Sequence, residues 1–250
     1  MGDARAYNLT MISRFHFPGR LSAAGEIELP EALAHHAVRV LRLRDGAPVV
    51  LFDGEGNEAD ATLSVRGKAV HARLESPRGV DRESPLTVVL VQALASGDKM
   101  DWVVQKAVEL GVTAIQPVQA ERSVLKLAGE RAERRRAHWQ QVAVSACEQC
   151  GRNRIPEVRP LQPLAHWLAG HRGALNYVLA PGGAAGFANE PAPAGGVHLL
   201  VGPEGGWSNL ELAAFDAAGC RRVRLGPRIL RTETAGLAAL AALQVRWGDF

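Results

Sequence analysis

The first third of the chain consists of short apolar segments, several with alternating polar positions, separated by residues that favour turns. Val, Phe and Leu recur in these segments, and Pro-Gly, Asp-Gly and Arg-Gly pairs lie between them. The pattern predicts five strands, at residues 13–17, 26–29, 47–52, 59–65 and 69–74. It also predicts one helix, at residues 30–41. We therefore expect a small, mostly β domain, either a barrel or a sandwich.

From residue 86 onward, the pattern changes to strands that alternate with helices. The strands are predicted at residues 86–94, 113–118, 175–179, 197–201 and 222–225. The helices are predicted at residues 98–110, 130–149, 209–218 and 233–247, the third of them opening with a capping box at Ser208-Asn-Leu-Glu211. Such alternation predicts an α/β fold: a mainly parallel sheet with helices on both faces. Residues 181–196, rich in Gly, Ala and Pro, are predicted to be a flexible surface loop.

These changes in pattern indicate where the domains begin and end. A polar segment with several residues that interrupt regular structure runs from 76 to 85. We place the first domain at residues 13–78, a linker at 79–85 and the second domain at 86–250. Residues 1–12 match neither pattern and are expected to form a disordered extension.

Composition narrows the class of protein. The chain has 250 residues and a net charge of +3, which is a weak argument for nucleic acid on its own. No apolar run reaches the roughly 20 residues of a membrane span, so we expect a cytoplasmic protein. Three cysteines cannot build a disulfide framework. Cys147 and Cys150 have the spacing of a zinc pair, but no second pair completes four ligands, and we expect no metal.

Two loops carry the candidate chemistry, at residues 200–208 and 225–234. Each follows a predicted strand, leads into a predicted helix, and contains a Gly-Pro pair and a glutamate. Loops at the carboxyl ends of parallel strands form ligand pockets in α/β proteins, so we expect one here. The alternative is that both are tight turns with a structural role only.

The glycine pattern of these loops argues against two common ligand classes. Gly202, Gly205 and Gly206 do not form the G-x-G-x-x-G pattern of dinucleotide binding, and no Gly-Lys-Ser/Thr of a P-loop is present. These absences argue against NAD, ATP and a small-molecule dehydrogenase. What is left is a glycine-lined pocket that offers backbone amides and carbonyls to a polar heterocyclic ligand.

The sequence of these loops resembles one family closely. Val201-Gly-Pro-Glu-Gly-Gly206 and the segment from Leu225 to Ala235 are similar to the bacterial 16S ribosomal RNA (uridine-N3)-methyltransferases of the knotted SPOUT superfamily. Further similar segments are 14–16, 36–42, 99–112, 121–123 and 146–152. The resemblance spans roughly residues 13–250. Trp207 and the loop at 182–196 look like local variations that do not touch the motif.

The resemblance implies a fold, a cofactor and partners. It implies a trefoil knot, which is rare in proteins, a PUA-like β-barrel as the first domain, and a homodimer. It also implies S-adenosyl-L-methionine as cofactor and ribosomal RNA of the small subunit as substrate. The residues that would bind the cofactor are Leu179, Ala180, Pro181, Val201, Gly202, Pro203, Glu204, Gly205, Gly206, Leu225, Gly226, Pro227, Ile229, Leu230, Arg231, Thr232, Thr234 and Ala235.

Methylation of uridine N3 defines the catalytic groups to look for. The N3 atom carries a proton at neutral pH, so a base is needed, and a cation would stabilise charge on the uracil oxygens. Glu233, then Glu204, are the candidate bases; Arg231, then Arg152, are the candidate cations. Glu233 could instead interact with its helix N-terminus, and Glu204 could fix its own loop. The N3 edge is paired in a duplex, so the target must be unpaired or flipped out.

The RNA contacts are expected at basic residues of both domains. Phosphate contacts provide affinity and register without reading sequence. The candidates are Arg14, His16, Arg39, Arg42, Arg122, Lys126, Arg135, Arg136 and Arg152. For residues 131–136, a solvated helix face is the alternative. Two other functions stay open: ribose 2′-O-methylation on the same fold, and a non-catalytic ribosome-assembly factor.

Overall fold

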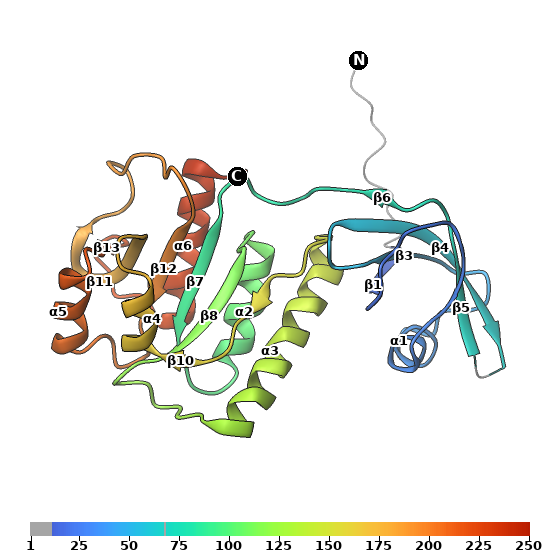
Figure 1. Cartoon of the computed structure of the whole chain (residues 1–250), viewed down its shortest axis with the longest axis horizontal. Coiled ribbons are helices and arrows are strands. Elements are labelled where there is room, and N and C mark those ends of the chain that lie inside the picture. Colours follow the sequence, from blue (N-terminus) through green and yellow to red (C-terminus); the bar gives the residue numbers. More distant parts are fainter. Residues whose placement is uncertain (1–11, 68) are drawn as a thin grey trace, which may run out of the picture. The chain divides into compact units, whose positions relative to one another are not determined.

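A computed structural model describes residues 12–67 and 69–250, which form two compact units (Figure 1). The first unit holds the chain up to Arg82 together with Cys147–Ile155, and the second holds Glu83–Ala146 and Pro156–Phe250. Residues 147–155 therefore group with the first unit, whereas the sequence pattern places them in the second domain. The extension expected at residues 1–12 lies, apart from Ile12, outside the described residues.

The first unit is built on one sheet with the strand order β1-β3-β4-β5-β2, and β6 pairs with β4. All pairs are antiparallel except β1 with β3. The core packs Phe15, Leu51, Leu63 and Ala72, each at an alternate position of its strand, so the period of two predicts the buried face. The strands are β1 (Ser13–His16), β2 (Gly25–Glu28), β3 (Pro48–Phe52), β4 (Asn57–Arg66), β5 (Ala69–Leu74) and β6 (Arg78–Gly79).

The helix predicted at residues 30–41 changes its winding halfway. It begins as α1 (Glu31–His35) and continues as a π-helical turn, η1 (His36–Val40). The turn is followed by Arg42, whose φ of 57° makes it the one non-glycine residue with a left-handed backbone in the described part of the chain. Pi turns and left-handed side-chain-bearing residues are both unfavourable and recur at functional sites.

The second unit contains a parallel sheet with the order β10-β8-β7-β12-β11-β13, and β9 pairs with β8. The five predicted strands of this unit all form, whereas the two-residue strands β9 and β10 are absent from the sequence prediction. The strands are β7 (Val88–Ala93), β8 (Ala114–Gln119), β9 (Glu157–Val158), β10 (Gln162–Pro163), β11 (Leu175–Ala185), β12 (Val197–Val201) and β13 (Arg221–Arg224).

Helices cover both faces of this sheet (Figure 1). On one face, alternate residues such as Val91 and Leu200 pack against Trp167 of α4 (Leu164–Gly170) and Phe215 of α5 (Asn209–Ala217). The sequence pattern does not predict helix α4. The other face meets α6 (Thr232–Trp247), which packs against α2 (Lys99–Glu109). The long helix α3 is Gly129–Cys150. The expected α/β fold is therefore confirmed, and the knot stays a prediction from the resemblance.

The prediction of a flexible loop at residues 181–196 is wrong for the first part of that segment. Strand β11 continues to Ala185 through an irregularity, because Leu179 and Ala184 both pair with Val223. Residues 180–183 therefore leave the ladder, and the strand resumes after them.

The rest of that segment is held by side-chain contacts. Phe187 is buried and meets Tyr177 edge-on, with ring centroids 5.2 Å apart. The Glu190 carboxylate accepts a hydrogen bond of 3.0 Å from the Tyr177 hydroxyl and forms an ion pair with Arg221. Arg246 donates to the Glu190 carbonyl over 3.1 Å. Gly and Ala content therefore predicts flexibility poorly here, because single residues anchor the segment.

Candidate active site

The two glutamate-bearing loops open from the same edge of the sheet. Strands β11, β12 and β13 are parallel neighbours, so the interruption of β11 after Leu179 and the segments that follow β12 and β13 meet at one edge of the sheet. They enclose a cavity of about 440 Å³. Its walls are formed by Lys99, Leu179, Pro181, Val201, Gly202, Pro203, Glu204, Gly206, Trp207, Ile229, Leu230, Arg231, Thr232, Glu233 and Ala235.

A second cavity, of about 160 Å³, shares Leu179, Pro181, Ile229, Leu230 and Ala235 with the first. It is completed by Ala180 and residues 223–228. Together the two cavities are lined by all the residues expected to bind a cofactor except Gly205 and Thr234. Thr234 is exposed on the first turn of α6, and a side chain at Gly205 would lie 3.0 Å from Cβ of Arg122.

Glu204 is fixed by the loop that follows β7. Its Oε1 accepts hydrogen bonds from the Ser96 backbone amide at 2.9 Å, the Ser96 hydroxyl at 2.7 Å and Lys99 Nζ at 2.8 Å. Burial raises the pKa of Glu204, but the hydrogen bonds from Lys99 and Ser96 outweigh it and lower the pKa to about 2. Such a carboxylate accepts a proton poorly at neutral pH. The geometry therefore favours Glu204 as an anchor of its loop over Glu204 as a base.

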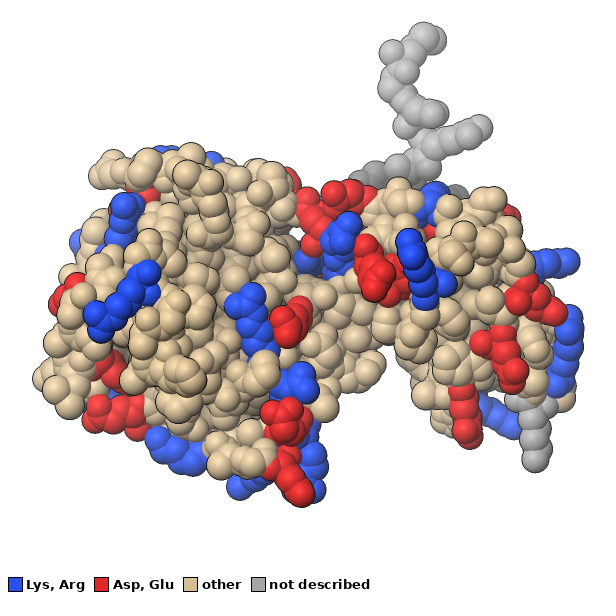
Figure 2. Space-filling view, viewed as in Figure 1, with Lys and Arg blue, Asp and Glu red and all other residues tan. Residues whose placement is uncertain are grey.

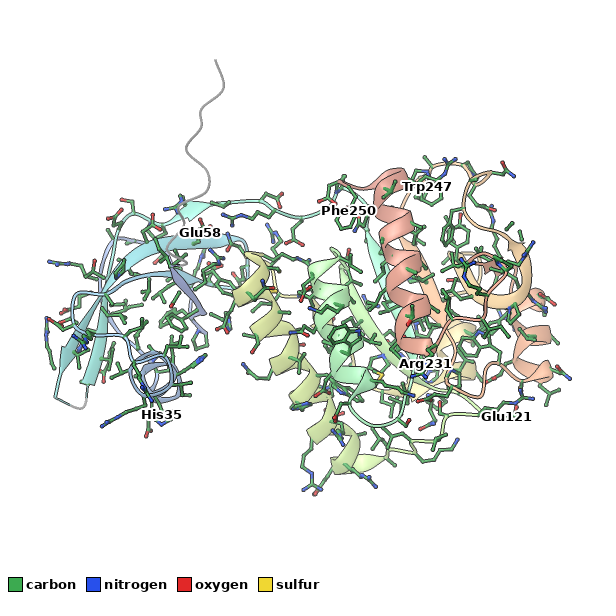
Figure 3. All side chains as sticks on the ribbon, turned by 180° about the vertical axis from the view of Figure 1, so that it is seen from behind. His35, Glu58, Glu121, Arg231, Trp247 and Phe250 are labelled. Carbon is green, nitrogen blue, oxygen red and sulfur yellow. The ribbon has the colours of Figure 1, made fainter. Side chains whose placement is uncertain are left out.

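Glu233 has the opposite surroundings. It lies in the first turn of α6, and its Oε2 atom is buried with no hydrogen-bond partner among the described residues. Arg231 is the N-cap of the same helix and is exposed, with its carbonyl accepting hydrogen bonds from the amides of Thr234 and Ala235. Figure 3 shows Arg231 at the N-terminal end of α6, the end that borders the cavity. The first-choice base and cation thus flank Thr232.

Trp207 belongs to the site, which corrects the view that it does not touch the motif. Its indole N–H donates to the Leu179 carbonyl over 3.1 Å, and the side chain is 7% exposed. A Cβ placed on Gly202 would lie 3.2 Å from the indole ring, so only glycine fits there without displacement. Trp207 therefore joins the end of β11 to the loop after β12. A large apolar residue directly after Gly-Gly in a polar loop is the sequence signal that could have indicated this.

Arg122 braces the same loop. Its Nη1 donates to the carbonyls of Gly205, at 3.2 Å, and of Trp207, at 3.4 Å. This arrangement gives Arg122 a role in holding backbone besides the RNA contact that the sequence suggests. The second-choice cation, Arg152, lies in the first unit and is buried there.

The candidate RNA-contact residues of the first unit differ in exposure. Arg14 is largely buried, where it donates to Glu58 at 2.9 Å and to Asn153 Oδ1 at 2.6 Å. Burial raises the pKa of Glu58, but hydrogen bonds from Arg82, Arg14 and Asn153 lower it to about 2. His16 is half-buried, and its amide donates to Glu148. Arg39 and Arg42 are exposed and follow α1.

In the second unit, the candidate RNA contacts lie at and before the start of α3. Figure 2 shows blue and red side chains close together there. Lys126 donates to the carbonyls of Ala120 and Glu121, and Arg136 pairs with Glu133 at 2.9 Å. Arg135 is exposed. A helix face exposed only to solvent also carries both positive and negative side chains. The RNA role of these residues therefore stays a prediction.

Comparison with known proteins agrees with this geometry. Residues 82–244 match the family model described as an RNA methyltransferase domain, and residues 29–75 match an RNA methyltransferase PUA domain. A relative named ribosomal RNA small subunit methyltransferase E, from Bacillus subtilis, is 35% identical over 84% of this chain and 86% of its own length.

Solved structures agree as well. The ribosomal RNA small subunit methyltransferase E of Neisseria gonorrhoeae, bound to S-adenosylmethionine, is 43% identical and covers 96% of this chain and 99% of its own, with a TM-score of 0.90. A methyltransferase from Legionella pneumophila, in complex with the same cofactor, is 36% identical over 96% of this chain and 100% of its own, also with a TM-score of 0.90.

The fold and the cavity thus define an α/β RNA methyltransferase domain that is joined to a PUA-like domain. More particularly, the chain belongs to the family of the ribosomal RNA small subunit methyltransferases E. Among its described residues, no helix is long and apolar enough to cross a membrane.

Proposed function

We propose that this protein transfers a methyl group from S-adenosylmethionine to N3 of a uridine in 16S ribosomal RNA. The observation that carries the proposal is the cavity at the ends of β11, β12 and β13. At this cavity the Glu233 carboxylate, whose buried Oε2 atom has no partner among the described residues, lies on one helical turn with an exposed cation, Arg231. Family membership supports the reaction class, since relatives carry the name of a small-subunit ribosomal RNA methyltransferase.

The residues present fit S-adenosylmethionine. A volume of about 440 Å³ falls in the range of small-molecule sites. Leu179, Val201 and Leu230 offer apolar contacts to an adenine ring. The free Oε2 of Glu233 is an acceptor suited to an ammonium group or to the proton of a bound base. Backbone groups of the loop at 202–206 remain for the polar parts of the ligand.

When bound, the cofactor supplies a methyl group activated on a sulfonium, and the protein contributes position and charge. Glu233 accepts the proton that leaves uridine N3, and Arg231 stabilises the negative charge that develops on the uracil oxygens. Glu204 keeps its loop in place through Lys99 and Ser96. Orientation is the larger contribution, because an in-line displacement depends steeply on geometry.

The RNA side of the proposal rests on the PUA-like domain and on exposed arginines. Arg39 and Arg42 of the first unit and Arg135 of the second are free to contact phosphates. We further propose that the enzyme acts as a homodimer on the small ribosomal subunit, in the cytoplasm. Ile229, which is 87% exposed beside the cavity, is an apolar residue that a second copy could cover.

One experiment tests the reaction directly. The purified protein is incubated with tritiated-methyl S-adenosylmethionine and small subunits from a strain that lacks this gene, and the product nucleoside is identified by mass spectrometry. We expect 3-methyluridine. Ribose methylation would overturn the substrate atom while keeping the reaction class. If no transfer occurs and calorimetry detects no cofactor binding, the protein is an RNA-binding assembly factor instead.

A further inference from the structure

A buried chain of hydrogen bonds connects β7 to both cofactor loops. Gln92, on β7, is 0% exposed, and its Nε2 donates to the Ala93 carbonyl at 2.9 Å and to the Thr232 hydroxyl at 3.0 Å. The Thr232 hydroxyl donates in turn to the Gly202 carbonyl at 2.6 Å. Thr232 opens α6, and Gly202 directly follows β12, so three separate segments meet at these atoms.

The acceptors at the two ends of this hydrogen-bond network determine which groups in it donate. The carbonyls of Ala93 and Gly202 can only accept hydrogen bonds. The amide group of Gln92 must therefore present its NH₂ side to Ala93 and Thr232, and the Thr232 proton must point to Gly202. The hydroxyl uses its one proton and one of its two acceptor positions in this way. The proton of Thr232 is therefore committed to the Gly202 carbonyl, although the residue also lines the cavity.

Close packing of α6 against β7 and β12 holds this hydrogen-bond network in place. A Cβ placed on Gly236 of α6 would lie 3.2 Å from Val201 and 3.7 Å from Oε1 of Gln92. Glycine at position 236 therefore lets α6 approach β7 and β12 closely enough for Thr232 to reach Gly202. The Gln92 Oε1 atom is buried and has no partner among the described residues. Such an orphaned acceptor is unfavourable for stability, which argues that the amide is kept for its donors.

From these contacts we infer that Gln92 and Thr232 are positioning residues for the methyl-transfer site. They fix the glycine loop at 202–206 relative to the helical turn that carries Arg231 and Glu233. A shift of this turn would move both catalytic candidates together, and geometry of that kind controls transfer rates. The inference rests on the proposed function, since it assumes that these loops bind S-adenosylmethionine.

The test uses the full-length protein and the affinity for S-adenosylmethionine, measured by calorimetry well below the unfolding temperature of every variant. Thr232→Val keeps the shape but takes one of the two acceptors from Gln92 Nε2 and the hydroxyl donor from the Gly202 carbonyl. We expect about tenfold weaker binding. Gln92→Met should weaken binding to a similar degree. Thr232→Ser keeps the hydroxyl and should bind within about threefold of the unchanged protein.

Gln116 provides a matched control. It is a buried glutamine on the neighbouring strand β8, and its Nε2 donates to the Pro117 and Pro160 carbonyls at 2.8 and 2.9 Å. Gln116→Met therefore removes a similar buried amide, away from the cofactor loops. We expect it to lower the unfolding temperature as Gln92→Met does, with unchanged affinity for the cofactor.

A double variant tests whether Gln92 and Thr232 act as one unit. If they do, Gln92→Met combined with Thr232→Val binds about as weakly as either alone, because the chain is already broken. Wild-type affinity in Thr232→Val and Gln92→Met would overturn the inference and leave the proposed function intact. A loss of affinity in Gln116→Met equal to that in Gln92→Met would also overturn it. Failure of the unchanged protein to bind S-adenosylmethionine would overturn both.

Discussion

Lys99 Nζ lies 2.8 Å from Oε1 of Glu204, and this ion pair joins the first turn of α2 to the glycine loop that follows β12. The two elements come from chain segments more than a hundred residues apart. They meet because β7 and β12 are parallel neighbours in the sheet, so their carboxyl ends deliver the following loops to one place. The glycine loop is therefore held by Lys99 of α2 as well as by the turns that its own glycines form.

Breaking this pair should weaken cofactor binding. Lys99→Met and Glu204→Gln each remove one charge from a contact whose side chains are 33% and 25% exposed. Because solvent screens such a pair, we expect a loss of about fivefold in affinity for S-adenosylmethionine. Calorimetry measures it, and the double variant should bind no more weakly than the singles. Affinity like that of the unchanged protein in both single variants would show that the loop needs no such support.

The base assignment can be tested without disturbing the fold. Glu233→Gln keeps the size of the side chain and removes its capacity to take a proton. We expect the single-turnover rate of methyl transfer to fall by about a hundredfold. Cofactor affinity by calorimetry and RNA affinity by filter binding should stay close to wild type. Glu204→Gln is the matched control, with a much smaller effect on that rate once the cofactor is saturating. If the order of the two effects is reversed, Glu204 is the base.

A substitution at Arg42 should change the stability of the protein and its affinity for RNA in different directions. Its left-handed backbone, with φ of 57°, disfavours any side chain, and the residue is exposed. Arg42→Gly should therefore raise the unfolding free energy by up to about 1 kcal/mol, or leave it unchanged. We expect weaker binding to small-subunit RNA at the same time. Arg20, exposed in the same unit, is the control position, as Arg20→Gly removes an equal charge. Unchanged RNA affinity in Arg42→Gly would remove Arg42 from the contacts.

His198 makes the second unit sensitive to acid. Its Nδ1 lies 2.8 Å from Oδ1 of Asn176, and its ring packs edge-on to Trp167 and His171. Burial, followed by the nearby His171 and Arg159, lowers the pKa of His198 to about 4. The unfolded chain binds a proton at the ordinary histidine pKa near 6.5, whereas the folded protein does so only near 4.

Stability should therefore fall as the pH decreases from about 6.5 to about 4, since protonation favours the unfolded state in this window. We expect His198→Gln, which keeps a hydrogen-bond donor for Asn176, to lose less stability over the same window. Urea unfolding at several pH values measures the difference between the two proteins. A variant whose unfolding free energy depends on pH as steeply as that of the unchanged protein would contradict the assignment. Carboxylates such as Glu58 contribute equally to the pH dependence of the unfolding free energy in both proteins, so their effect cancels in the difference.

Much of the fold is readable from local patterns. The capping box at Ser208 forms as predicted, with its hydroxyl accepting from the Glu211 amide, because it involves only residues three apart. The loops after β12 and β13 are punctuated by Gly-Pro pairs that need no distant partner to make a turn. The two-residue strands β9 and β10 and the short α4 were missed, because so few residues establish no period.

The residues missed in the site have a common cause. Gln92 lies inside an apolar run, where a single amide resembles an ordinary strand position until Thr232 is seen beside it. Lys99 belongs to a segment that resembles the family, but only the pairing of β7 with β12 brings it to Glu204. Trp207 looks like a local variation in the sequence because its partner, the Leu179 carbonyl, lies far away along the chain. Contacts over long sequence separations are what a one-dimensional pattern omits.

The interruption of β11 has a consequence for how this family can diverge. Leu179 and Ala184 share one partner on β13, so the residues between them bulge toward the cavity while the strand is pinned on either side. Because Ala184 and Ala185 pair with β13, a change in the length of the chain beyond Ala185 does not move the cavity wall. Beyond the anchored residues Phe187 and Glu190, the segment at 191–196 can therefore change in length without altering the catalytic geometry.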